Sequence, residues 1–181
     1  CIYPKKSPQP IKEKNLLNGP LEATNEGYAL AKIVGIKTAS FYFKKNNMLT
    51  ICPMICNMYG TNDNYDLEKS HVLSALVRKF VDAKKNNLNK VTLWGSGKAK
   101  REFIHVSEAS RAIILLFEKF HKNEIVNVGT GTEISIKNLA NIIAKYTNYS
   151  GKICWDRSMP DGMSRKCLDI RILRGLNFKN K

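Results

Sequence analysis

The fold of this chain is indicated first by five residues, Tyr28-Ala29-Leu30-Ala31-Lys32. Residues four apart lie on one face of a helix, so Tyr28 and Lys32 can share a site if this stretch is helical. The charge of Lys32 favours the phenolate form of the tyrosine, which makes Tyr28 a candidate general acid at a carbonyl group. A surface helix with one aromatic side chain and one solvated amine explains an isolated match of this spacing as well.

Patterns typical of strands and helices alternate along the rest of the chain. Short apolar, partly β-branched runs predict strands, and apolar residues at helical spacing predict the helices between them. Ser107 and Ser135 stand where two of these helices would begin, as N-cap residues do. This alternation is typical of the α/β class. The expected strands cover residues 49–54, 91–94, 102–106, 124–128 and 152–155, and the expected helices cover residues 28–43, 71–81, 107–120, 135–149 and 168–176.

The charge balance and the hydropathy limit the possible partners. The 181 residues carry 30 basic and 15 acidic side chains, a net charge of +15. The lysines are scattered, however, and no zinc-finger or RNA-binding signature accompanies them, so we expect no dedicated nucleic-acid surface. No apolar run is long enough to span a bilayer, and we therefore expect no membrane partner.

The cysteines and histidines predict neither a disulfide framework nor a metal site. Cysteines stand at positions 1, 52, 56, 154 and 167 without a Cys-x-x-Cys pair, and the histidines at 71, 105 and 121 have no metal-ligand spacing. A reducing compartment fits this pattern, so we expect a cytoplasmic protein.

A pyrophosphate-binding turn is the element that the sequence lacks. Such a turn is rich in glycine, joins a strand to a helix, and holds the phosphates with backbone amides. The candidates are Gly95-Ser96-Gly97-Lys98 and Gly129-Thr130-Gly131, and both lack a third glycine. Ordinary turns between elements are the favoured interpretation of both.

The stretch from Pro20 to Lys32 resembles the start of the catalytic helix in the extended short-chain dehydrogenases/reductases, and within them the GDP-L-fucose synthases. The resemblance continues in order along nearly the whole chain. The matching blocks are Cys1-Ile2-Tyr3-Pro4, Asn57-Met58-Tyr59-Gly60, Asp63-Asn64, Ser70-His71-Val72, Trp94-Gly95-Ser96-Gly97, Arg101-Glu102-Phe103-Ile104-His105-Val106, Asn127-Val128-Gly129-Thr130-Gly131 and Pro160-Asp161-Gly162.

This resemblance implies a Rossmann-type α/β fold of which the chain is the C-terminal portion. Residues 1–60 would form the last part of the NADP-binding domain, including the helix with Tyr28 and Lys32. Residues 61–181 would form mainly the smaller, substrate-binding domain, with some segments returning to the Rossmann sheet. The N-terminal half with its Gly-rich turn, roughly 100 residues or three βαβ units, would be missing, and the chain alone is expected to be inactive.

The implied reaction is the NADPH-dependent 3,5-epimerisation and 4-reduction of a GDP-4-keto-6-deoxy sugar. Tyr28 would stabilise the oxyanion and donate a proton to the new alkoxide, while Lys32 would also reach the nicotinamide ribose. The resemblance assigns the epimerisation to Cys1 and His71, because thiols and imidazoles exchange protons readily near neutral pH. His71 and Asn57 would border the NADP(H), although Ile55-Cys56 replaces the usual Pro-Thr before that asparagine.

Cations would hold the diphosphate of the nucleotide sugar. The resemblance assigns this contact to Arg101, with a second contact at Lys79 or at its neighbour Arg78. Trp94 would lie against the nucleotide. Asp161 and Lys166 are further substrate-side candidates.

Other functions also fit part of the sequence. A nucleotide-sugar 4-epimerase or 4,6-dehydratase would use Tyr28 and Lys32 without needing Cys1 and His71. An inactive remnant or a basic binding module would use none of them. The resemblance further implies a homodimer formed through the helix that carries Tyr28, to which Ile33, Ile36 and Phe43 could contribute, although core burial explains these apolar residues equally well.

Overall fold

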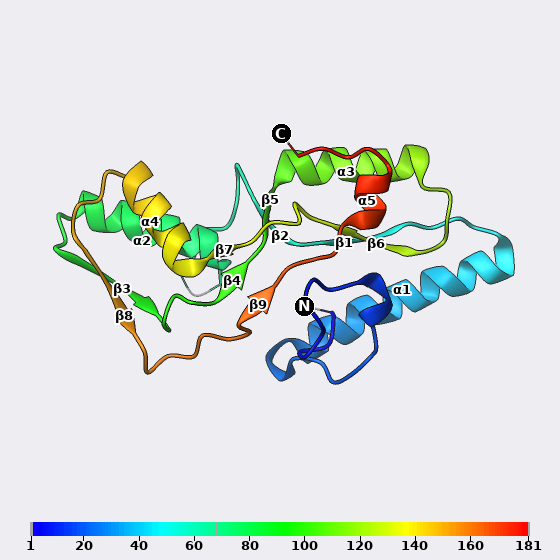
Figure 1. Cartoon of the computed structure of the whole chain (residues 1–181), viewed down its shortest axis with the longest axis horizontal. Helices are drawn as coiled ribbons and strands as arrows, with labels where there is room; N and C mark the ends of the chain where they lie inside the picture. The colour runs from blue at the N-terminus through cyan, green and yellow to red at the C-terminus, as the bar shows by residue number, and fades with distance from the viewer. Residues whose placement is uncertain (1, 68, 181) are drawn as a thin grey trace. The chain divides into compact units, whose positions relative to one another are not determined.

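The structure, a computed structural model, describes residues 2–67 and 69–180 (Figure 1). The chain divides into two compact units, which are described separately below. Unit 1 comprises Cys1–Met58, Glu102–Thr132 and Lys166–Lys181, and unit 2 comprises Tyr59–Arg101 and Glu133–Arg165. The backbone therefore passes between the units four times.

Unit 1 is built on a parallel pair of strands, β1 (Cys52–Ile55) and β6 (Ile125–Val128), with Cys52 opposite Ile125. Helix α1 (Glu26–Asn46) precedes β1, and α3 (Val106–Lys119) precedes β6. The unit also contains η1 (Glu13–Asn15), η2 (Ala23–Asn25), β5 (Phe103–His105), which pairs with β2 (Asn57–Tyr59), and α5 (Arg171–Gly175). The most deeply buried apolar side chains of its core, each with at most 1% exposure, include Ile11, Ile104, Leu116, Val126, Val128 and Leu173.

Unit 2 contains a second parallel pair, β3 (Lys90–Trp94) and β8 (Lys152–Asp156). Two amphipathic helices, α2 (Val72–Lys85) and α4 (Ile136–Tyr146), accompany it and pack against each other. Short strands form a three-stranded sheet in the order β7-β4-β9, where β7 is Ile134–Ser135, β4 is Lys100–Arg101 and β9 is Arg165–Lys166.

The apolar residues whose helical spacing predicted a helix over residues 71–81 lie on one buried face of α2. Leu76 and Phe80 of α2 are buried, and Leu73 and Val77 beside them are partly buried. The Phe80 ring packs edge-to-face on Tyr149, with centroids 5.5 Å apart. This packing holds α2 in the interior of unit 2.

Helix boundaries confirm some of the predicted caps and correct others. Ser135 caps α4 as predicted, since its Oγ accepts a hydrogen bond from the Asn138 amide at 3.1 Å. Ser107, by contrast, lies inside α3, and the N-cap is His105, whose Nδ1 accepts from the Ser107 amide at 3.3 Å. The α4 helix ends at Tyr146, before Asn148 takes a left-handed conformation.

The last helix is shorter than predicted. It begins at Arg171 instead of Leu168, because residue 168 forms a β-bridge with Ile11 and remains extended. The sequence patterns also did not predict β2, β4, β7 and β9, which are only two or three residues long. Helices nevertheless alternate with parallel strands, so the α/β class is confirmed. Throughout residues 2–67 and 69–180, we find no helix both long and apolar enough to cross a bilayer.

Candidate active site

Helix α1 places Tyr28 and Lys32 together on its exposed side. The Lys32 Nζ lies 5.5 Å from the centroid of the Tyr28 ring, within the range of a cation–π interaction. Tyr28 is 57% exposed, and Lys32 is exposed as well. The prediction that these residues share one helix face is confirmed, and both polar groups are accessible to a ligand.

The orientation of this pair follows from the buried side of the same helix. Ala29 and Ile33, also four residues apart, are 0% and 6% exposed and belong to the core of unit 1. Each residue along a helix is rotated by about 100° from its predecessor, so burying Ala29 and Ile33 turns Tyr28 and Lys32 away from the core. The local sequence thus fixes which face carries the polar pair.

The remaining unit 1 candidates differ in their surroundings. The Asn57 side-chain amide donates a hydrogen bond to the Glu102 carbonyl oxygen at 2.8 Å, so part of its hydrogen-bonding capacity is used inside the protein. Lys166 lies half-buried in β9. Cys1 falls outside the described residues.

His71 in unit 2 is the N-cap residue of α2. Its imidazole makes no capping hydrogen bond to the helix, and the residue is exposed. The backbone carbonyl of His71 instead accepts from the Ala75 amide at 2.9 Å, which begins the helical hydrogen-bond pattern. The side chain therefore remains accessible for chemistry while the backbone serves the helix.

Two of the predicted nucleotide-binding residues lie together in unit 2. The Lys79 Nζ lies 5.5 Å from the Trp94 ring centroid, and Trp94 is 64% exposed. Arg78 is instead paired with Asp82 at 2.5 Å on the same helix. The geometry thus associates Lys79, and not Arg78, with the exposed indole.

Arg101 is a half-buried guanidinium held by main-chain oxygens. Its Nη1 donates to the carbonyls of Lys100, at 2.8 Å, and Met163, at 2.6 Å. Burial lowers the pKa of Arg101 from its ordinary value, and the negative charge of Asp161 opposes this shift. Among the described residues Arg101 forms no ion pair, so an anionic ligand would add to the partial compensation that Asp161 provides.

Asp161 binds the turn after β3. Its Oδ1 accepts from the Ser96 amide and its Oδ2 from the Ser96 hydroxyl, both at 2.6 Å. These hydrogen bonds lower the pKa of Asp161 below its usual range. The neighbouring Gly95 has φ +75°, and a side chain there would collide with the Asp161 carboxylate. Asp161 therefore shapes this turn, a role that the sequence did not suggest.

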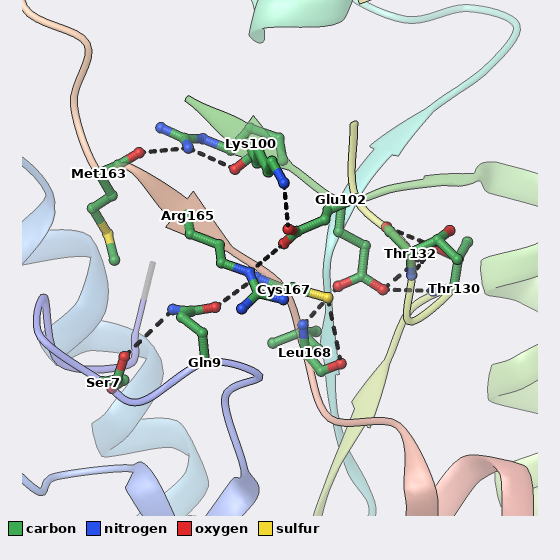
Figure 2. Close-up of polar contacts among 12 residues, drawn as sticks. Ser7, Gln9, Lys100, Glu102, Thr130, Thr132, Met163, Arg165, Cys167 and Leu168 are labelled. Atoms are coloured by element: carbon green, nitrogen blue, oxygen red, sulfur yellow. Dashed lines mark hydrogen bonds and ion pairs between the residues drawn. The ribbon is translucent and has the colours of Figure 1, made fainter. Parts of the chain in front are cut away.

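Glu102 is the prominent site-region residue to which the sequence assigned no role. It is 1% exposed, and its Oε1 accepts from the Thr130 amide at 2.7 Å (Figure 2). The Gly131 amide donates to the same oxygen at 2.6 Å. The Glu102 Oε2 accepts from the Leu168 amide at 2.7 Å. Glu102 stands directly before the apolar run Phe103-Ile104, but this position alone does not distinguish a buried carboxylate from an exposed one.

These contacts bear on where a dinucleotide could bind. The Ser96, Thr130 and Gly131 amides all donate to carboxylates of the chain itself, so neither glycine turn fits a pyrophosphate. The accessible phenol and amine of Tyr28 and Lys32 fit the nicotinamide-ribose end. In the part of the chain that the structure describes, no group of three His, Cys, Asp or Glu residues is placed to hold a metal ion.

Comparison with curated proteins identifies relatives of this chain. The chain is 47% identical over 181 residues to the putative GDP-L-fucose synthase 2 of Arabidopsis thaliana, covering 100% of this chain and 55% of that protein. It is 42% identical over 187 residues to the GDP-L-fucose synthase of Escherichia coli K12, covering 98% of this chain and 58% of that protein. The chain thus spans somewhat more than half the length of these curated relatives.

Solved structures share the fold as well. The GDP-L-fucose synthetase of Naegleria fowleri, in a structure bound to NADP, superposes with a TM-score of 0.92 at 28% identity, covering 100% of this chain and 59% of that one. This match confirms the predicted Rossmann-type fold. The sequence profile of the NAD dependent epimerase/dehydratase family matches residues 1–129. The chain belongs to the NAD dependent epimerase/dehydratase family.

Proposed function

We propose that this chain is the C-terminal portion of a GDP-L-fucose synthase, which epimerises GDP-4-keto-6-deoxy-D-mannose at C3 and C5 and reduces the C4 ketone to give GDP-L-fucose. The observation that carries the proposal is the exposed pair of Tyr28 and Lys32 on α1, in which the Lys32 Nζ lies 5.5 Å from the centroid of the Tyr28 ring. Relatives at 42–47% identity that are named GDP-L-fucose synthases support the choice of substrate.

Tyr28 and Lys32 serve the reduction. NADPH, when bound, supplies the hydride that the C4 carbon receives. Tyr28 hydrogen-bonds the carbonyl oxygen and gives its phenolic proton to the alkoxide as the carbonyl becomes an alcohol. Lys32 places its positive charge beside the phenol ring and binds the nicotinamide ribose. Asn57 and His71 complete the proposed NADP(H) contacts.

Cys1 and His71 serve the epimerisation. The C4 carbonyl acidifies the hydrogens on C3 and C5, since the charge left by proton removal spreads onto the oxygen as an enolate. Each centre loses a proton on one face and regains one on the other. The exposed imidazole of His71, which makes no capping bond to α2, supports its assignment as one of the two proton-exchanging groups.

Unit 2 supplies the proposed nucleotide contacts. Arg101 binds the diphosphate, because its half-buried charge forms no ion pair among the described residues and is offset only by the electrostatic effect of Asp161. Trp94 stacks on the nucleotide with Lys79 beside it, whereas Arg78 stays with Asp82. Lys166 remains a proposed substrate contact, and Asp161 acts through the Ser96 turn. We accordingly propose that most nucleotide contacts come from unit 2 and most contacts of the nicotinamide end from unit 1, with His71 of unit 2 and Lys166 of unit 1 as the exceptions.

A homodimer formed through α1 is part of the proposal. Of the residues expected at that interface, Ile33 belongs to the core, and Ile36 packs against it. The exposed apolar residues of α1 are instead Leu30, Val34 and Phe41, at 50%, 63% and 58% exposure. Sedimentation of the complete enzyme with Val34→Asp would test this face, because a charge there should favour the monomer. The cytoplasmic location and the inactivity of the chain on its own remain predictions.

The first test is Tyr28→Phe in the complete enzyme that carries this chain. Losing the phenolic proton donor should lower the rate of NADPH oxidation by on the order of 10²-fold or more, while solvent-proton exchange at the sugar stays partly active. Gly35→Ala, on the same helix and without a neighbour within 4 Å, is the matched control and should keep its activity. A Tyr28→Phe rate within a few-fold of the parent would show that another residue is the acid.

The second test separates this function from a 4-epimerase or a dehydratase. Substituting Cys1 or His71 should impair deuterium incorporation from D₂O at C3 and C5, and direct hydride transfer should yield a 6-deoxy sugar reduced without inversion. Equal loss of exchange and reduction, with an unchanged product, would assign structural roles to both residues. A parent enzyme that forms no GDP-L-fucose would exclude the proposed function.

A further inference from the structure

Glu102 is bound almost entirely by backbone groups. Its two carboxylate oxygens accept from the amides of Thr130 and Leu168, both at 2.7 Å (Figure 2). The Gly131 amide donates to the carboxylate at 2.6 Å, and the backbone carbonyl of Glu102 accepts from the Asn57 side chain at 2.8 Å. Hydrogen bonds to an ionised acceptor are shorter and stronger than neutral ones. A residue that is 1% exposed therefore holds three amides that are 28, 29 and 66 residues away in sequence.

These partners share a position in the chain. The backbone passes between the units after Met58, Arg101, Thr132 and Arg165. Asn57 immediately precedes Met58, and Glu102 immediately follows Arg101. Thr130 and Gly131 lie just before the third passage, and Leu168 lies three residues after the fourth. Glu102 thus gathers, on the unit 1 side, all four segments that lead into unit 2.

The site is shaped for a carboxylate. Consecutive amides at Thr130 and Gly131 converge on one oxygen, as backbone nests do on an anion. A Cβ atom at Gly129 would collide with the same oxygen, so the close approach requires glycine there. A glutamine at position 102 would present an NH₂ group to at least one of these N–H donors and leave it without an acceptor.

We propose that Glu102 is a positioning residue for the reaction. From inside unit 1, its carboxylate binds the third and fourth connecting segments, and its backbone carbonyl binds Asn57 on the first. Together these bonds set the places of Asn57 and Lys166. This inference rests on the proposed function, because Asn57 and Lys166 are proposed contacts of NADP(H) and of the GDP-sugar. Tyr28 and Lys32 lie on α1, which is not one of these segments.

The proposal predicts a split between binding and turnover. In the complete enzyme, Glu102→Gln should raise the KM for the GDP-sugar about tenfold and the KM for NADPH less, because the backbone carbonyl that binds Asn57 is retained, while kcat stays within about threefold of the parent. Hydrogen–deuterium exchange at the amides of Thr130, Gly131 and Leu168 should become at least about tenfold faster, as expected when a buried charge-assisted bond is lost.

Glu133→Gln is the matched control. Glu133 also has little exposure, 14% for its side chain, but it holds the side chains of Arg165 at 2.7 Å and Lys100 at 3.6 Å within unit 2. Its loss should leave exchange at Thr130, Gly131 and Leu168 unchanged. Glu102→Asp keeps the charge on a shorter stem, and we expect it to recover part of the binding lost in Glu102→Gln.

Several results would overturn the proposal. Unchanged exchange at the three amides in Glu102→Gln would show that the carboxylate does not hold them. Faster exchange with unchanged KM values, or a fall in kcat alone, would leave Glu102 with a purely structural role. If Glu102→Gln does not fold, Glu102→Asp carries the test, and behaviour identical to the parent overturns the inference. A parent that forms no GDP-L-fucose defeats the proposed function, whereas the exchange experiment still decides whether Glu102 holds the segments.

Discussion

Two short glycine turns, one in each unit, look alike in sequence but are built differently. Gly95-Ser96-Gly97 follows β3 in unit 2, and Gly129-Thr130-Gly131 follows β6 in unit 1. A carboxylate of the chain binds each turn: Asp161 accepts from Ser96, and Glu102 accepts from Thr130 and Gly131. Asp161 is exposed, whereas Glu102 is 1% exposed.

Two turns with similar sequences can therefore depend to different degrees on the carboxylate that binds them. In a phosphate loop, such amides would be left for the ligand. Here a carboxylate of the protein takes the place that a phosphate would have. Water can replace the exposed Asp161 as the acceptor for Ser96, but it has little access to the amides around Glu102. Removing the acceptor should therefore cost much more in unit 1 than in unit 2.

The largest expected effect is on NADPH affinity, and it tests the property that both turns share, namely amides that already donate to a carboxylate of the chain. Because the amides of both turns are already bonded, residues 1–181 alone should show no micromolar affinity for NADPH in a calorimetric titration. Micromolar binding would contradict this expectation. In that case, amide chemical-shift changes at Ser96 or at Thr130 would show which turn had released its carboxylate.

Gly129→Ala should sharply destabilise the buried turn. The new methyl group collides with the Glu102 carboxylate, so the protein must either displace that side chain or lose its hydrogen bonds. We expect a loss of about 3 kcal/mol in the free energy of unfolding, measured with urea. Gly35→Ala is the control, because it lies in α1 with open space around it and should stabilise by about 1 kcal/mol. A loss below about 1 kcal/mol for Gly129→Ala would mean that the buried turn adapts easily.

Asp161→Asn should affect the exposed turn only locally. Exchange of the Ser96 amide should quicken a few-fold, while the urea midpoint moves much less than in Gly129→Ala, because water replaces the lost acceptor. Asp156→Asn is the matched control, since Asp156 is bonded in the same way to the amide and hydroxyl of Ser158, at 3.0 and 2.6 Å. If Asp161→Asn shifted the midpoint as strongly as Gly129→Ala, the contrast between the turns would be wrong.

The smallest expected effect is a pH dependence of stability that is confined to acidic pH. Hydrogen bonds from Ser96 hold the pKa of Asp161 below its usual range, so the ionised form is favoured in the folded protein. The resulting stability is fully present above the unfolded-state pKa of about 3.9 and is lost as the pH falls through the lower folded-state value. The difference in stability between the parent and Asp161→Asn should therefore be constant from pH 5 to 7 and shrink below about pH 4. A difference that grew on acidification would contradict the sign.

Local patterns made part of the site predictable. The Tyr28–Lys32 pair depends only on helical spacing, and the apolar residues of α2 are periodic enough to predict its buried face. The interpretation of both glycine segments as turns also held, because neither has the glycine spacing of a phosphate loop. In each case, the decisive information lies within a few residues of the feature.

Other parts of the molecule had no local signal. Strands β4, β7 and β9 have two residues each, too few to show alternation, and they exist because they pair with one another. The N-cap of α3 is His105 and not Ser107, since strand β5 ends at His105 and α3 begins at the next residue. Packing between distant segments set these boundaries.

The sequence by itself determined the helix that presents Tyr28 and Lys32, the α/β alternation and the family, because all three follow from residues close together in the chain or from their order. Only the tertiary structure decided the role of Glu102. Its partners are up to 66 residues away, and a glutamate before an apolar strand could equally have pointed to solvent. Glu102 is buried where three backbone amides converge, and no spacing along the chain predicts this convergence. A carboxylate is stable inside a protein only where the fold brings hydrogen-bond donors to it.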